Sequence, residues 1–141
     1  MINISKKLIL FLLATTCVLP MCAANKDKSV KAYVFGFAAS FNDSIVYLTD
    51  IQELAPAYVT KKHKHLIDRS EYSYQLRNHI IQQQSEAHPT VVTFFKLNRK
   101  DAEKKYAKIK RKYIEKAKGK YIVKYLKTEE FRYQPIAREQ E

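Results

Sequence analysis

The alternation of apolar and polar residues predicts a β-hairpin after an apolar leader. Two segments rich in aromatic and β-branched residues, 30–41 and 44–54, flank the pair Asn42-Asp43, whose side chains favour tight turns. The following segment, 55–67, combines a proline with a basic cluster and is expected to form a loop.

The next segment has the 3.6-residue period of a helix and is expected to run from Asp68 to Gln84. Glu71 follows Asp68 by three residues, which predicts a capping box at the start. One face of this helix carries Tyr72, Leu76, His79, Ile80 and Gln83. On that face, the histidine is expected to be half-buried and hydrogen-bonded rather than a catalytic base.

A continuous apolar run at 90–97 predicts a buried central strand. Asn98 is expected to cap a second helix, and Gly119 is expected to end it. The apolar stripe of this helix consists of Ala102, Tyr106, Ile109, Tyr113 and Ala117. A last clear strand is expected at 120–127, with a short edge strand at 131–133 before the chain frays.

The predicted element order is β-β-α-β-α-β, which defines the α+β class. We expect a two-layer sandwich with a sheet of about four strands. Because strand-helix-strand crossovers are right-handed, both helices are predicted to cover one face of that sheet. The length after the leader suits one domain, 25–141, with a frayed polar C-terminal tail.

The leader has the layout of a secretory signal peptide. Lys6 and Lys7 precede a short apolar run, 8–19, and small residues follow it up to Ala24. The run is shorter than the roughly 20 residues that span a bilayer. Neither cysteine directly follows Gly, Ala or Ser, which disfavours a lipoprotein signal. We therefore expect cleavage of 1–24 and export to the periplasm or the medium, with no transmembrane span afterwards.

Cleavage after Ala24 would remove Cys17 and Cys22, the chain's two cysteines. The remaining chain could then form no disulfide and would contain no thiol nucleophile or thiolate metal ligand. The composition resembles that of small, cysteine-poor exported bacterial proteins.

Positive charge is concentrated in one part of the chain. Lys and Arg number 26 against 14 Asp and Glu, for a formal net charge of +12. The segment 96–127 holds fourteen of the basic residues and three acidic ones. Such a directional field favours anionic partners.

The outward face of the second predicted helix is expected to bind anions. The residues assigned to it are Lys100, Lys104, Lys108, Arg111, Lys112 and Lys118, helped by Lys61, Lys62 and Lys64. Like charges four residues apart cost helix stability, so this pattern is unusual for a merely solvated helix. The leading interpretation is a binding module for an anionic envelope polymer or an acidic protein surface, with plain solubility as the alternative role of this face. Nucleic acid suits the chemistry but ranks lower for an exported protein.

Aromatic side chains form a second candidate surface. Tyr33, Phe35, Phe37, Tyr121 and Tyr125 alternate on predicted strands and would line a sheet face without helices. Core packing or contact with another chain is favoured over ligand stacking. The alternative function is accordingly a protein-interaction or assembly domain that acts through this face.

Catalytic chemistry has little support in the sequence. His63 and His65 alternate as strand-borne metal ligands can, but lysines surround them. Two glycines in the whole chain leave no phosphate-binding glycine loop, and no serine lies in a nucleophile elbow. We assign no catalytic residue, metal or cofactor, and a small hydrolase or nuclease ranks last. The sequence indicates no oligomeric state.

Overall fold

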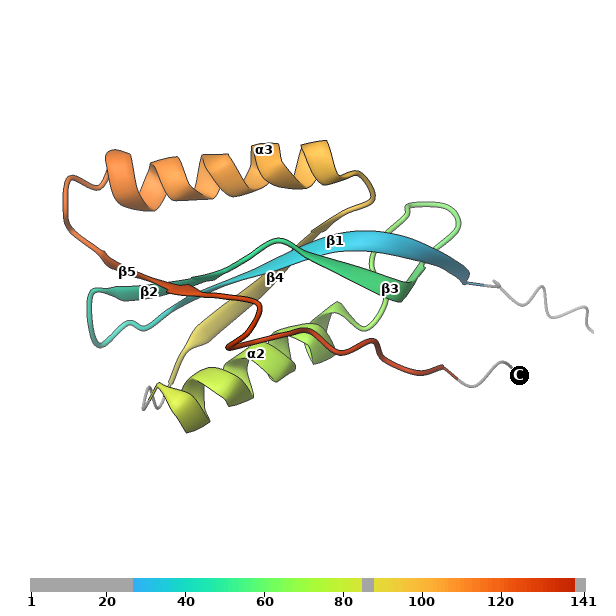
Figure 1. The fold of residues 1–141 in the computed structure, drawn as a ribbon, viewed down its shortest axis with the longest axis horizontal. Helices are drawn as coiled ribbons and strands as arrows, with labels where there is room; N and C mark the ends of the chain where they lie inside the picture. Colours follow the sequence, from blue (N-terminus) through green and yellow to red (C-terminus); the bar gives the residue numbers. More distant parts are fainter. Residues whose placement is uncertain (1–26, 85–87, 139–141) are drawn as a thin grey trace, which may run out of the picture.

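The computed structural model describes residues 27–84 and 88–138, and the predicted signal peptide lies outside them. Its elements are β1 (Lys28–Ala39), β2 (Ile45–Thr49), β3 (Gln52–Val59), α2 (Arg69–Gln83), β4 (Thr90–Lys96), α3 (Arg99–Lys110), a π-helical turn (Arg111–Glu115) and β5 (Ile122–Leu126). They form one mixed sheet with two helices (Figure 1), which confirms the α+β class.

β1 is the central strand of this five-stranded sheet. Residues 37–39 pair with β2, residues 28–34 pair with β3, and residues 33–39 pair with β4. Since a strand has only two edges, β2 and β3 must lie end to end along the edge opposite β4. β5 runs parallel to β2. The fifth strand thus arises because the predicted return strand is broken in two, and the sheet remains four strands wide.

β3 occupies a segment that the sequence predicts as loop. Val30 pairs with Ala57 and Ala32 with Leu54, so Ala55 and Pro56 lie opposite the single residue between them. This arrangement is a β-bulge, one of the places where a sheet tolerates a proline. The prediction of a loop from residue 55 is therefore wrong up to Val59.

The two helices cover opposite faces of the sheet, which corrects the prediction of one shared face (Figure 1). A Cβ atom on Gly36 would collide with Leu76 of α2, whereas the neighbouring Phe35 packs against Tyr106 of α3. The connection through α2 crosses from β3 to β4, and the connection through α3 crosses back from β4 to β5. Two right-handed crossovers that run in opposite directions place their helices on opposite faces.

The main core lies between the sheet and α2. It contains Tyr72, Leu76 and Ile80 of the helix, with Val34 and Ala38 of β1 beneath them. Its members and the partly buried residues packed on them fall between residues 30 and 136, so a chain that begins at Asn25 contains this whole core. β4 lies at an edge of the described sheet rather than at its centre. Its continuous apolar run follows from contact with α2 on one face and α3 on the other.

The C-terminal segment crosses α2 as an ordered strap instead of fraying. Phe131 and Tyr133 are buried in the main core, without the predicted edge strand. The Gln52 side chain donates to the Phe131 carbonyl and accepts from the Tyr133 amide, both at 2.8 Å. Farther along, Arg138 bonds to Asp68 and Asp27. The strap supplies aromatic volume that the core would otherwise lack.

Both helices start where the sequence predicts, but only one of the two predicted capping interactions is present. The Asn98 side chain accepts from the Lys100 amide at 2.8 Å, so the predicted cap of α3 is confirmed. Asp68 does precede α2, but it makes no side-chain cap bond and has a left-handed backbone. Its carboxylate pairs with Arg138 instead, at 3.0 Å, which takes the place of the predicted capping box.

Among the described residues, no helix combines the length and the apolar character needed to cross a bilayer. The same residues hold no cluster of three or more His, Cys, Asp or Glu side chains arranged to bind a metal ion.

Candidate functional site

Helix α3 rests on a layer of aromatic rings that fixes its orientation. The Phe35 ring stacks on Phe94 and meets Tyr106 edge-on, with both pairs of centroids 5.2 Å apart. Phe37 lies 4.5 Å from Tyr113. Such ring pairs have preferred geometries, so the helix cannot turn about its axis without losing them. The ring contacts on the sheet side of α3 therefore fix which of its residues face outward.

These contacts show where the predicted aromatic face lies. Phe35 is fully buried beneath α3, and Tyr33, Phe37 and Tyr121 are half-buried. Tyr125 alone of the five is exposed, at 43 %. The sheet face that the sequence leaves open is covered by α3, because the two helices do not share a face. Ala102 and Tyr106 of the predicted apolar stripe point into this layer.

Several lysines flank the helix with their ammonium groups over aromatic rings. Lys105 Nζ lies 5.1 Å from the Phe94 centroid, and Lys110 Nζ lies 5.3 Å from that of Tyr125. Lys112 Nζ lies 5.2 Å from the neighbouring Tyr113 ring. The ring quadrupole attracts the cation, and the alkyl stem covers apolar surface. These lysines therefore keep their charge at defined positions along the helix.

The basic face is the outward surface formed by Lys100, Lys104, Lys108, Arg111, Lys112 and Lys118, all of which are exposed. Within the described residues, none of its five lysines forms an ion pair, whereas Arg111 Nε lies 3.6 Å from Glu115. At about 1.5 Å per residue, the face extends for roughly 25 Å. All six predicted residues are exposed, and Arg111 is paired with Glu115. Three of them lie on α3, Arg111 and Lys112 lie on the π-helical turn, and Lys118 lies in the turn after it.

Lys61, Lys62 and Lys64 are also exposed, but on the loop between β3 and α2. Thr60 organises this loop, since its carbonyl accepts from the Lys64 amide at 2.9 Å and its hydroxyl accepts from the His65 amide at 3.1 Å. No hydrogen bond or ion pair of the described residues joins the loop to α3. The two predicted basic groups therefore lie on different elements of the fold.

The helix leaves regular α geometry at Arg111, within the basic face. The Lys116 amide donates to the Arg111 carbonyl at 2.9 Å, which is a π-type bond over five residues. Gly119, with φ of +78°, lies four residues beyond this turn, so the helical segment ends earlier than the predicted stop. No sequence signal pointed to the π-helical turn. It carries Lys112 and leads into Lys118 beside the start of β5.

Tyr106 is the titratable group nearest the centre of the aromatic layer. Its burial, followed by the nearby Asp50 and Tyr125, raises the pKa of Tyr106 to about 12. The phenol therefore stays neutral at physiological pH and offers neither a base nor a negative charge beneath the lysines. The chemistry available to this face is electrostatic binding.

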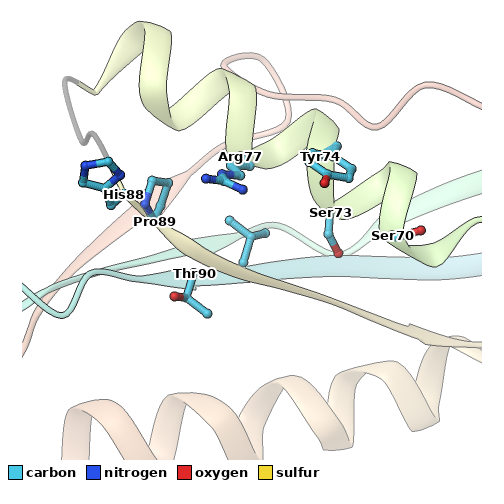
Figure 2. A pocket seen from close by; sticks show the side chains of 8 residues that line it. Ser70, Ser73, Tyr74, Arg77, His88, Pro89 and Thr90 are labelled. Carbon is cyan, nitrogen blue, oxygen red and sulfur yellow. The ribbon is translucent and has the colours of Figure 1, made fainter.

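A hollow lies between α2 and the start of β4, with a volume of about 470 Å³ (Figure 2). Ser73, Tyr74 and Arg77 of α2 form one wall, and His88 and Thr90 lie across from them. The Ser73 hydroxyl lies 2.9 Å from Thr93 Oγ1, so it ties the helix to the sheet. The hollow is an open groove, and Ser73 helps to attach α2 to the sheet.

The two candidate histidine sites have different surroundings. His63 and His65 are exposed, with their ring centroids 5.7 Å apart, and no metal cluster of the described residues includes them. His79 is half-buried against the Phe131 ring, at 5.2 Å, as the sequence predicts. Its Nε2 atom is buried without a hydrogen-bond partner among the described residues, so the prediction that its bonding is satisfied is wrong.

Stability is expected to fall in mild acid because of His79. Burial lowers the pKa of His79 below its ordinary value, opposed only in part by Glu130. The unfolded chain then binds a proton at higher pH than the folded chain, so the free energy of unfolding decreases as pH falls below about 6.5. His79→Leu should weaken this decrease in urea titrations between about pH 7 and about pH 5. Parallel pH curves for the two proteins would contradict the assignment.

Comparison of the chain with protein-family models, with curated proteins and with solved structures finds no match in any of the three. The fold and the surface chemistry of the described residues therefore carry the functional argument.

Proposed function

We propose that the chain is an exported, non-catalytic binding module whose basic face engages an anionic component of the cell envelope. One observation carries the proposal. Four exposed lysines without ion pairs, Lys100, Lys104, Lys108 and Lys112, lie on α3 and its π-helical turn, whose other side is fixed by aromatic packing. An array of unpaired cations on a fixed helix attracts a polyanion, and the helix backbone loses little conformational freedom when it binds.

The physical driving force would be neutralisation of phosphate or carboxylate groups with release of their counterions. For a duplex-like polyanion, each phosphate contact steepens the logarithmic salt dependence by about 0.9. Repulsion between Lys104, Lys108 and Lys112 on neighbouring turns costs the free helix a few tenths of a kcal/mol per pair, by a rough general value. A bound anion would relieve that repulsion, so binding should also stabilise α3.

Reversal of three charges on the basic face tests the proposal. The triple variant Lys104→Glu, Lys108→Glu, Lys112→Glu should lose at least about tenfold in affinity for lipopolysaccharide or anionic vesicles, which corresponds to about 1.4 kcal/mol. The fold should persist, because all three side chains are exposed. Affinity is measured by co-sedimentation with the chain that begins at Asn25, and folding by circular dichroism.

The matched control reverses Lys61, Lys62 and Lys64, which changes the net charge by the same amount on a separate loop. We expect a smaller loss of affinity from this variant, because its lysines lie on a loop and not on the helix that carries the basic face. Equal losses would mean that binding follows net charge alone. Unchanged binding by the α3 variant would overturn the proposal.

A further inference from the structure

The turn between β1 and β2 presents an aromatic side chain to solvent. Phe41 is 92 % exposed, more than any other large apolar residue of the described chain. The turn around it is ordered by two short-range bonds, since Ser40 Oγ accepts from the Asn42 amide at 3.1 Å and Asp43 Oδ1 accepts from the Ile45 amide at 2.8 Å. The ring is thus held away from the core at the tip of a defined hairpin.

A second exposed apolar residue lies at the same end of the molecule. The Ile122 amide donates to the Ser44 carbonyl at 2.9 Å, which joins the start of β5 to the hairpin turn. Ile122 is 61 % exposed. Figure 1 shows the β1–β2 turn and the connection into β5 at one end of the fold, away from the C-terminal strap. Phe41 and Ile122 together form the apolar tip of the molecule.

Lysines surround the approach to the apolar tip. Lys116, Lys118 and Lys120 lie in the connection from the π-helical turn to β5, and all are exposed. Of the acidic groups nearby, Glu115 pairs with Arg111, whereas Asp43 keeps its negative charge and accepts the Ile45 amide, so the three lysines outnumber it. The end of the molecule therefore combines exposed apolar side chains with unbalanced positive charge, and Lys118 belongs to the basic face as well.

We propose that this end docks on an anionic lipid bilayer, with Phe41 inserted at the boundary between headgroups and acyl chains. The inference rests on the proposed function and names its partner as a membrane surface. A soluble polyanion would bind the lysines but offers no apolar phase for Phe41. An anionic bilayer offers negative headgroups to the lysines and an apolar phase to Phe41. Lysines close to an anionic leaflet supply the long-range attraction, and the apolar tip supplies insertion.

The chain contains no tryptophan, so Phe41→Trp introduces a single reporter at the tip. The variant that begins at Asn25 is mixed with vesicles of phosphatidylglycerol and phosphatidylcholine in equal parts, and with phosphatidylcholine alone. We expect a blue-shifted emission and quenching by brominated acyl chains with the anionic vesicles only. The matched control Tyr74→Trp places the same reporter on the exposed surface of α2 and should show neither change.

A second variant, Phe41→Ser, separates insertion from charge attraction. It should weaken binding to the anionic vesicles about tenfold, as expected for loss of one buried aromatic ring. Its binding to a DNA duplex, a polyanion without an apolar phase, should be unchanged. Because Phe41 makes no core contact, circular dichroism should report a native fold.

The outcomes distinguish the two proposals. Vesicle binding without a blue shift, or a shift that is equal on uncharged vesicles, overturns docking by the tip and leaves the basic face intact. Binding to lipopolysaccharide or DNA but not to vesicles does the same. Absence of binding to every anionic probe overturns the proposed function together with this inference.

Discussion

Replacement of Gly36 with alanine is expected to lower the free energy of unfolding by about 2 to 3 kcal/mol. Gly36 lies at the centre of β1, where an added Cβ atom would overlap the Leu76 methyl of α2 and the Tyr133 hydroxyl of the strap. Both neighbours are buried, so neither can move aside into solvent. Gly36→Val should cost more still, and urea denaturation measures both.

The second glycine of the chain provides the matched control. Gly119 has φ of +78° and nothing within 4 Å of an added Cβ, so alanine there meets only backbone strain. That strain is worth about 1 kcal/mol, and asparagine should reduce it. A neutral Gly36→Ala variant would contradict the close approach of α2 and the strap to β1.

Gln52→Ala is expected to cost about 3 kcal/mol, because it leaves two buried backbone groups without partners. The side chain of this buried residue bonds to the Phe131 carbonyl and to the Tyr133 amide, 2.8 Å from each. Each orphaned group costs about 1 to 3 kcal/mol when water cannot reach it. Loss of this clamp should also release the aromatic residues of the strap, which amide hydrogen exchange detects.

The chain contains a second clamp of the same design at its surface. The Gln75 side chain donates to the Gln134 carbonyl at 3.0 Å and accepts from the Gln134 amide at 2.8 Å. Because water can replace these exposed bonds, Gln75→Ala should cost less than about 1 kcal/mol. Similar losses from the two variants would show that burial of the Gln52 clamp does not determine its energy.

The local pattern of the chain predicts most of the fold. The apolar periods at 68–84 and 90–97 place α2 and β4 to within a residue at each end. The bulge around Pro56 was missed because a proline usually ends a strand, and nothing local indicates that a bulge will accept it. The sequence does not reveal the buried strap, because the Phe131 carbonyl and the Tyr133 amide bond to Gln52, about eighty positions away in the chain.

The sequence identifies the basic residues of the candidate site, but not which face of the sheet α3 covers. The period of α3 identifies the exposed basic residues, since helical geometry alone decides which side chains point away from Tyr106. Which face of the sheet each helix covers depends on the direction of its crossover. That direction depends on strand order, which the local pattern does not reveal. The exposure of Phe41 was hidden in the sequence, because it continues the apolar pattern of β1 by two residues past the end of the strand.

Salt dependence tests the central claim, electrostatic binding by the basic face, most directly. The chain from Asn25 and its Lys104→Glu, Lys108→Glu, Lys112→Glu variant are titrated with one anionic probe, a DNA duplex, over a series of salt concentrations. For the unaltered chain, the logarithm of affinity should fall linearly with the logarithm of salt, and the variant's slope should be smaller by about 2.7, or about 0.9 for each lost contact. Identical slopes for the two proteins would contradict the account.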